Sequence, residues 1–155
     1  MDVKLINPFI DATMYVLETL ASTKATAGKP YVKKNGAAQG DISGVIGLSG
    51  EARGTISVSF SEKCIAGIVS QMFGEEITGV NDEVKDAVGE ITNMISGQAR
   101  QRLEQEGRIL KGGVPTVVVG KNHSITHITN QPVIAIPFES QYGGFSIEVC
   151  IEDSE

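Results

Sequence analysis

The sequence predicts an α+β fold in which a six-stranded, mainly antiparallel sheet carries two long helices on one face, with one short helix besides. Three observations predict it. Two long segments repeat apolar residues at helical spacing, six shorter segments have the apolar or alternating pattern of strands, and the elements recur in the same order in both halves. With 155 residues, of which 41% are apolar, the chain suits one domain over residues 1–155.

The first long helix is expected from Asn7 to about Thr23. Pro8 lies early in it, where its missing N–H costs no hydrogen bond. Apolar residues then follow helical spacing, namely Ile10, Met14, Leu17 and Leu20. The short helix is expected to begin after Ser61, a suitable N-cap, and to end near Gly74.

The second long helix is expected to open at Asn81 or Asp82, either of which can cap a helix N-terminus, and to extend to about Gly107. Its apolar residues form a stripe at the spacing of a helix with one buried face, namely Val84, Ala87, Val88, Ile91, Ile95, Ala99 and Leu103. This helix is therefore predicted to pack on the sheet along that stripe.

The predicted strands are residues 29–33, 42–48, 55–60, 114–120, 131–138 and 144–151. In residues 55–60 apolar and hydroxyl side chains alternate, which is typical of a strand with one buried face. The last strand, GFSIEVCI, has one acidic residue and no proline. We expect it to be an exposed edge strand suited to pairing with another chain.

The two halves of the chain, residues 5–60 and 81–152, resemble each other. Each contains a helix followed by three strands, which predicts an internal repeat with pseudo-twofold symmetry. When the two long helices are aligned, Tyr15 and Glu18 in the first take the places of Glu90 and Asn93 in the second. The second helix therefore carries a polar pair that the first lacks.

Composition disfavours several classes of function. The net charge is −6 and there is no block of basic residues, so a nucleic-acid partner is not expected. No apolar run is long enough to span a membrane and the first residues do not resemble a signal or transit peptide, so a cytoplasmic location is expected. Cys64 and Cys150 belong to no metal-binding motif and are interpreted as buried, reduced thiols.

One face of the second long helix has an unusual composition. Asp86, Glu90, Asn93, Gly97 and Arg100 follow one another at intervals of three or four residues, on a face directed away from the apolar stripe. Asn lowers helix stability by several tenths of a kcal/mol relative to Ala, and an interior glycine by up to about 1 kcal/mol. Gly89 and Gly97 flank the pair and allow another molecule close access. The face is therefore a candidate active site.

The pattern D-x-x-x-E-x-x-N, here Asp86, Glu90 and Asn93, followed by Pro115, resembles the signature of the CheC/CheX/FliY family of chemotaxis phosphatases. The gap before Pro115 is about one residue shorter than is usual in the family. Because only one copy of the signature is present, the chain is most similar to the CheX branch. The resemblance extends over essentially the whole chain.

The resemblance implies a phosphatase for the aspartyl phosphate of a CheY-type response regulator. Asn93 is then expected to orient the attacking water and Glu90 to bind the regulator's lysine. Asp86, Gly89, Gly97 and Arg100 are expected to contact the regulator. No metal or cofactor is expected on this chain, because a divalent metal such as Mg²⁺ would lie on the regulator. The resemblance also implies a homodimer.

The sequence leaves two other functions open. One is a non-catalytic binding or scaffold module of the chemotaxis or flagellar switch machinery, and the other is a phosphatase for a regulator outside chemotaxis. An intact Glu90–Asn93 pair favours catalysis over the scaffold. His123 and His127 are four residues apart, but in an extended segment, without a third ligand, this spacing is not interpreted as a metal site.

Overall fold

The described part of the chain contains three helices. The computed structural model describes residues 3–33, 40–123, 125 and 131–153. Its helices are α1 (Val3–Ala21), α2 (Glu62–Phe73) and α3 (Asp82–Gln105). Ser61 caps α2 by accepting a hydrogen bond from the Cys64 N–H, and Asn81 caps α3 by accepting one from the Val84 N–H. Both predicted starts are confirmed, and Asn81 is the residue that caps α3.

The predicted start of the first helix is wrong. α1 begins at Val3, not at Asn7, and therefore contains Pro8 in its interior. Proline removes one helical hydrogen bond and is normally costly at such a position. Leu5 and Phe9, both buried in the core, extend the apolar face of α1 across the proline. Their burial offsets the lost hydrogen bond, and the helix continues.

The six predicted strands are all present, and two short ones are added. The described strands are β1 (Thr26–Ala27), β2 (Tyr31–Lys33), β3 (Gly40–Gly50), β4 (Ala52–Phe60), β5 (Leu110–Gly112), β6 (Thr116–His123), β7 (Val133–Ser140) and β8 (Gly143–Asp153). They form one sheet in the order β1-β7-β8-β4-β3-β5, in which β2 also pairs with β7 and β6 with β3. The internal repeat stays a prediction.

The expectation that GFSIEVCI is an edge strand is wrong. This segment lies in β8, which is paired on one side with β4 and on the other with β7. Its side chains on both faces of the sheet are buried, as Ile147 and Glu148 illustrate. An apolar strand without proline is equally suited to the interior of a sheet, and the choice depends on strand order rather than on local composition.

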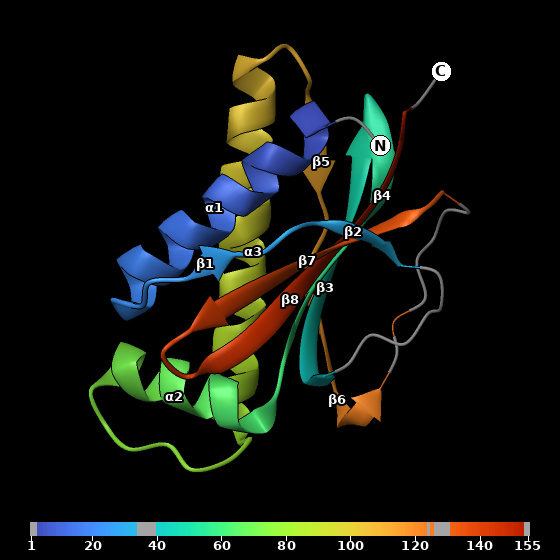
Figure 1. The fold of residues 1–155 in the computed structure, drawn as a ribbon. Coiled ribbons are helices and arrows are strands. Elements are labelled where there is room, and N and C mark those ends of the chain that lie inside the picture. Colours follow the sequence, from blue (N-terminus) through green and yellow to red (C-terminus); the bar gives the residue numbers. More distant parts are fainter. Residues whose placement is uncertain (1–2, 34–39, 124, 126–130, 154–155) are drawn as a thin grey trace.

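The two long helices lie side by side on one face of the sheet (Figure 1). All seven residues of the predicted stripe on α3 are buried, so its predicted packing is confirmed. They join one hydrophobic core with the inward side chains of the sheet and of α1. A helix held along its whole apolar face presents the opposite face in a fixed orientation.

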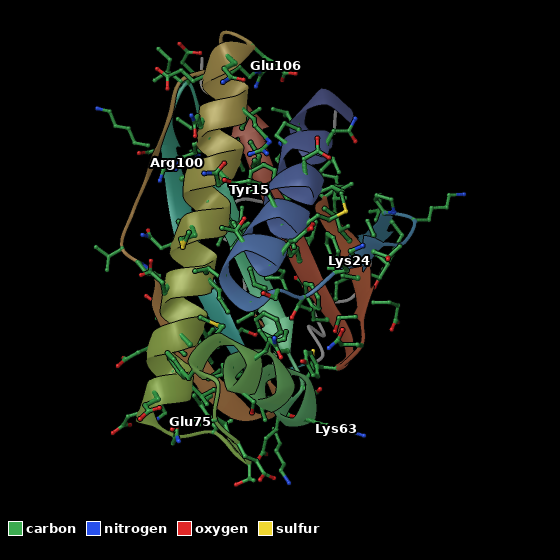
Figure 2. The ribbon with its side chains drawn as sticks, turned by 90° about the vertical axis from the view of Figure 1, so that its left-hand side faces the viewer. Tyr15, Lys24, Lys63, Glu75, Arg100 and Glu106 are labelled. Carbon is green, nitrogen blue, oxygen red and sulfur yellow. The ribbon has the colours of Figure 1, made fainter. Side chains whose placement is uncertain are left out.

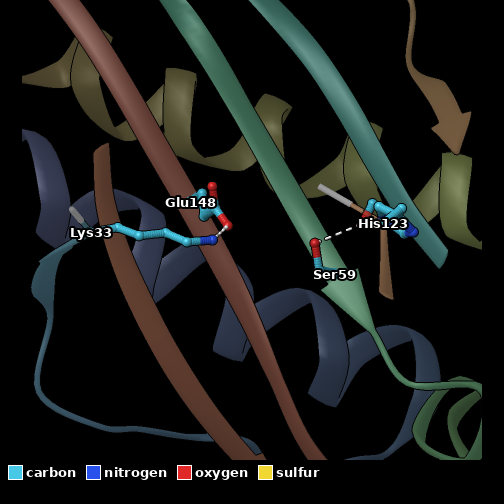
Figure 3. Close-up of polar contacts among 5 residues, drawn as sticks. Lys33, Ser59, His123 and Glu148 are labelled. Carbon is cyan, nitrogen blue, oxygen red and sulfur yellow. Dashed lines mark hydrogen bonds and ion pairs between the residues drawn. The ribbon is translucent and has the colours of Figure 1, made fainter. Parts of the chain in front are cut away.

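The other face of the sheet carries a buried polar layer (Figure 3). Lys33 and Glu148 form an ion pair at 2.7 Å, with both side chains largely buried. The Ser43 Oγ lies 2.6 Å from the Ser59 Oγ and 2.6 Å from the His123 Nε2, and the His123 Nδ1 lies 2.7 Å from the Gly120 carbonyl oxygen.

His123 has a structural role in this polar layer. Since a carbonyl only accepts, Nδ1 donates to Gly120 and Nε2 accepts from Ser43. Both ring nitrogens are therefore engaged within the sheet. His127, the other member of the rejected metal pair, lies outside the described residues.

Gly44→Ala is expected to lower the free energy of unfolding by about 1–3 kcal/mol, as overpacking of a tight contact does. Gly44 in β3 faces Thr92 in α3, and an added Cβ would meet the Thr92 Oγ1 and lie 2.8 Å from its Cβ. Urea unfolding measures the change. Gly47→Ala in the same strand is the control, because an added Cβ there meets nothing within 4 Å. Equal stability of the two variants would contradict this account of how α3 is seated.

Candidate functional site

The polar face of α3 is directed outward, as predicted. Asp86, Glu90 and Asn93 are exposed, whereas Gly97 and Arg100 are half-buried. Glu90 and Asn93 are three residues apart, which places them about one helical turn apart on neighbouring positions of the surface. Neither side chain has a hydrogen-bond or ion-pair partner within the described residues. A carboxylate and a carboxamide are therefore both available to a ligand.

The backbone beneath this pair is firmly held. Thr92 is fully buried, and its hydroxyl donates to the Val88 carbonyl at 2.7 Å. Its side chain occupies the space that the missing Cβ of Gly44 leaves on β3. Because Thr92 immediately precedes Asn93, a close contact between α3 and the sheet lies under the candidate site.

The two glycines beside the pair have different surroundings. The nearest neighbouring atom to a Cβ added at Gly97 would be the Arg100 Nη2, at 3.8 Å. The helix surface is therefore open there. A Cβ added at Gly89 would lie 3.6 Å from the Val117 Cγ2 in β6. Gly89 is thus at the flank of the face, beside the sheet. Contact of either glycine with a partner stays a prediction.

Arg100 is held in place at the far end of the face. Its Nε donates to the Ser96 Oγ at 3.2 Å, and its guanidinium lies over Gly112 of β5, where an added Cβ would be 2.9 Å from the Arg100 Cζ. Figure 2 shows Arg100 on the side of α3 away from α1. Within the described residues it has no ion-pair partner. The structure therefore supplies a fixed cation on the same face as Glu90 and Asn93.

The connection between β5 and β6 borders the same face. The strands that it joins approach α3 at two places, β5 where Gly112 lies against the Arg100 guanidinium and β6 where Val117 lies near Gly89. The intervening Val114 and Pro115 therefore lie beside the stretch of α3 between these two positions, which includes Asn93. Pro115, which the signature includes, thus borders the candidate site, and Val114 beside it is 86% exposed.

The corresponding place on α1 has a structural contact instead. The Arg102 guanidinium of α3 lies 5.6 Å from the centre of the Tyr15 ring, and its Nη1 donates to the Gln98 Oε1. Figure 2 shows Tyr15 at the junction of the two helices. A cation–π contact between helices is a reason for tyrosine at this position.

The remaining chemistry of the described part is sparse. Both cysteines are buried and neither forms a disulfide, as predicted, and burial raises the pKa of the Cys64 thiol to about 11, so Cys64 is not a nucleophile at neutral pH. No group of three or more His, Cys, Asp or Glu side chains among the described residues is arranged to hold a metal ion. None of the described helices is both long and apolar enough to cross a membrane.

Comparison with known proteins gives a consistent result. The family model described as "Chemotaxis phosphatase CheX" matches residues 42–139, well over half of the chain. A crystal structure of the chemotaxis protein CheX from Desulfovibrio desulfuricans is 47% identical in sequence. It covers 96% of this chain and 99% of its own, with a TM-score of 0.90. The CheY-P phosphatase CheX of Thermotoga maritima is 28% identical over 126 residues, 81% of each chain.

A more distant structure shares the fold. The CheX of Borrelia burgdorferi, solved in complex with CheY, BeF3 and Mg²⁺, is 22% identical and covers 96% of this chain and 97% of its own, with a TM-score of 0.81. Taken with the matched residues and the high similarity over nearly the full length of the Desulfovibrio protein, the conclusion is plain: this chain belongs to the CheX family of chemotaxis phosphatases.

Proposed function

We propose that this protein accelerates hydrolysis of the aspartyl phosphate of a CheY-type response regulator, with Asn93 orienting the attacking water and Glu90 binding the regulator's lysine. The observation that carries the proposal is the exposed, unpaired Glu90–Asn93 pair on a helix whose opposite face is fully buried. The complex of the Borrelia relative with CheY supports a CheY-type partner.

The proposed reaction transfers a phosphoryl group from the regulator's aspartate to water. The oxygen of water forms a bond to phosphorus as the bond from phosphorus to the aspartate oxygen breaks, which leaves a carboxylate and inorganic phosphate. The carboxamide of Asn93 has a donor and an acceptor on one rigid group, and can hold one water in a single orientation in line with that bond. The glutamine that positions water in small GTPases does the same.

Glu90 would fix the position of the regulator. Its carboxylate, exposed on the same surface as Asn93, is suited to accept a charge-assisted hydrogen bond from a lysine ammonium. This bond would set the depth and angle at which Asn93 enters the regulator's site. The metal and the lysine in this scheme both belong to the regulator, so this chain is proposed to act without a cofactor of its own.

Four further residues are proposed to contact the regulator. Asp86 and Arg100 lie about one to two turns from the pair on the same face, and Gly89 and Gly97 leave the helix surface low beside it. A surface on which the Glu90 and Asn93 side chains project, with little bulk around them, is suited to enter a narrow phosphorylation site. The charged residues would fix the orientation of docking.

Release of inorganic phosphate from phosphorylated CheY-type regulators tests the proposal. With the protein at one tenth of the regulator concentration or less, each molecule must act repeatedly to increase the rate. A panel of chemotaxis and other regulators identifies the substrate. A protein that binds a regulator but leaves its dephosphorylation unchanged would be the scaffold module instead.

The protein is expected to be a homodimer that pairs through the edge of the sheet at β2. This edge lies at the opposite end of the sheet from β5 and β6, so pairing there leaves α3 free. Tyr31 and Val32 in β2 are each 53% exposed, and a twofold edge pairing would cover them. Sedimentation equilibrium should give twice the monomer mass of 16.4 kDa, with a shift toward the monomer in Val32→Asp. A wild-type mass of one chain would contradict the dimer.

A further inference from the structure

The segment that borders the candidate site is unusually rich in exposed aliphatic side chains. Seven large hydrophobic residues of the described chain are exposed, and three of them lie in the arm from Ile109 to Val119 that runs along α3. The third, Val114, is the most exposed of all at 86%. It adds almost nothing to the core, and so the fold gives no reason for an apolar side chain at this position.

Val114 is nevertheless held in a defined place. The N–H of the preceding Gly113 donates to the Gly47 carbonyl at 2.9 Å, and Pro115 follows with its restricted backbone. The strands on either side, β5 and β6, both pack against α3. An apolar side chain that is both exposed and fixed loses little conformational entropy when a partner covers it.

From this arrangement, and resting on the proposed function, we infer that the connection between β5 and β6 is the second half of the regulator docking surface. Val114 is its apolar anchor, and Arg100, seated over Gly112, is its cation. This half sets which receiver domain binds and how tightly, whereas Asn93 sets the rate of hydrolysis.

The position of the connection supports this division. Val114 lies between Gly112 and Val117, which flank α3 on the side of Gly89 and Arg100, and helical spacing places Glu90 on the other side of Asn93 from Gly89. A receiver domain that covers the pair must therefore also lie against the connection. A partner that covers the exposed Val114 side chain removes its apolar surface from water, which favours binding.

The charge of Arg100 selects the kind of partner. The whole chain has a net charge of −6, so an unpaired guanidinium on this face is locally distinctive. A phosphorylated receiver site carries a phosphoryl group and the carboxylates that hold its metal, and its rim is therefore negative. A guanidinium fixed by Ser96 and Gly112 is preorganised to meet such a rim.

Gly112 is a positioning residue in this scheme. A Cβ there would lie 2.9 Å from the Cζ, Nε and Nη2 of Arg100, and would displace the end of a flexible side chain rather than backbone. Gly112→Ala is thus expected to move the cation while leaving Asn93 and Glu90 unaltered. It should weaken docking in the same direction as Arg100→Ala.

The test measures docking and hydrolysis separately. The dissociation constant is determined with a CheY-type receiver domain activated by beryllofluoride and Mg²⁺, which binds without turnover, and kcat is determined with the phosphorylated receiver. We expect Val114→Ala to raise the dissociation constant about 5- to 10-fold and Val114→Asp more, with kcat at saturation unchanged. Ile109→Ala, at the far end of the same arm, should change it less than about twofold.

Each outcome decides one point. If the wild-type protein binds the activated receiver and Val114→Asp binds equally well, the inference is overturned and the proposed function stands. If Val114→Ala weakens binding as expected but the wild-type protein releases no phosphate, the catalytic proposal fails and the docking surface stands. If Gly112→Ala binds as the wild type does while Arg100→Ala binds weakly, the position of the Arg100 guanidinium over Gly112 does not contribute to docking. That result contradicts this part of the inference.

Discussion

Asn93→Ala is expected to lower kcat for regulator dephosphorylation by about 100-fold while KM changes less than about threefold. The side chain is exposed and unpaired in the free protein, so its removal leaves the fold intact. Its proposed work is to hold one water in line with the scissile bond, and loss of such positioning costs on the order of 100-fold. Stopped reactions at saturating and limiting regulator concentration separate the two constants.

A sharper variant at the same position is Asn93→Asp, which keeps the size of the side chain but removes both N–H donors and adds a negative charge beside the phosphoryl group. It should be at least as inactive as Asn93→Ala. Tyr15→Ala and Glu18→Ala are the controls, because they alter the corresponding positions of α1 and should retain the wild-type kcat in protein that melts cooperatively. A loss in either control as large as that in Asn93→Ala would contradict a single site on α3.

Most of the fold could be predicted because its elements have strong local patterns. The seven-residue stripe of α3, the caps at Ser61 and Asn81 and the six predicted strands all depend on patterns within a segment. The errors concern properties that depend on distant residues. β1 and β5 are two and three residues long and exist because β7 and β3 lie beside them.

The position of GFSIEVCI within the sheet depends in the same way on strand order. Its local composition is the same whether it lies at an edge or between β4 and β7. The sequence predicts the wrong start for α1 because the penalty of Pro8 is local, whereas the burial of Leu5 and Phe9 that offsets it is tertiary.

Part of the candidate site can likewise be predicted from local spacing, and part cannot. The polar residues of α3 can be predicted because helical geometry alone places them on one face. The sequence does not predict Gly112 and Val114 as part of the site, because they lie outside α3. Their nearness to Arg100 and Asn93 arises only when β5 and β6 pair with β3. The signature includes Pro115, but its position beside α3 depends on the pairing of β5 and β6 with β3.

Glu90→Ala is expected to raise KM by about 10- to 100-fold and to lower kcat by a smaller factor. A hydrogen bond to a charged group contributes about 1.5–3 kcal/mol, and each 1.4 kcal/mol is tenfold in affinity. The effect on kcat follows because a regulator docked without this bond is free to shift, and Asn93 then holds its water less well aligned. The steady-state constants of the two variants should thus differ in kind, with Asn93→Ala acting on kcat and Glu90→Ala chiefly on KM.

Glu90→Gln is the matched variant, because it keeps the shape and one acceptor oxygen but removes the charge. If Glu90 binds a lysine, Gln should restore part of the affinity, and the difference between wild type and Glu90→Gln should shrink as salt is added, since screening weakens the charged bond and not the neutral one. A wild-type KM in Glu90→Ala would remove Glu90 from docking. Equal KM values for Glu90→Ala and Glu90→Gln, both raised, would mean that the charge alone is recognised and that the hydrogen-bond geometry assigned to Glu90 is wrong.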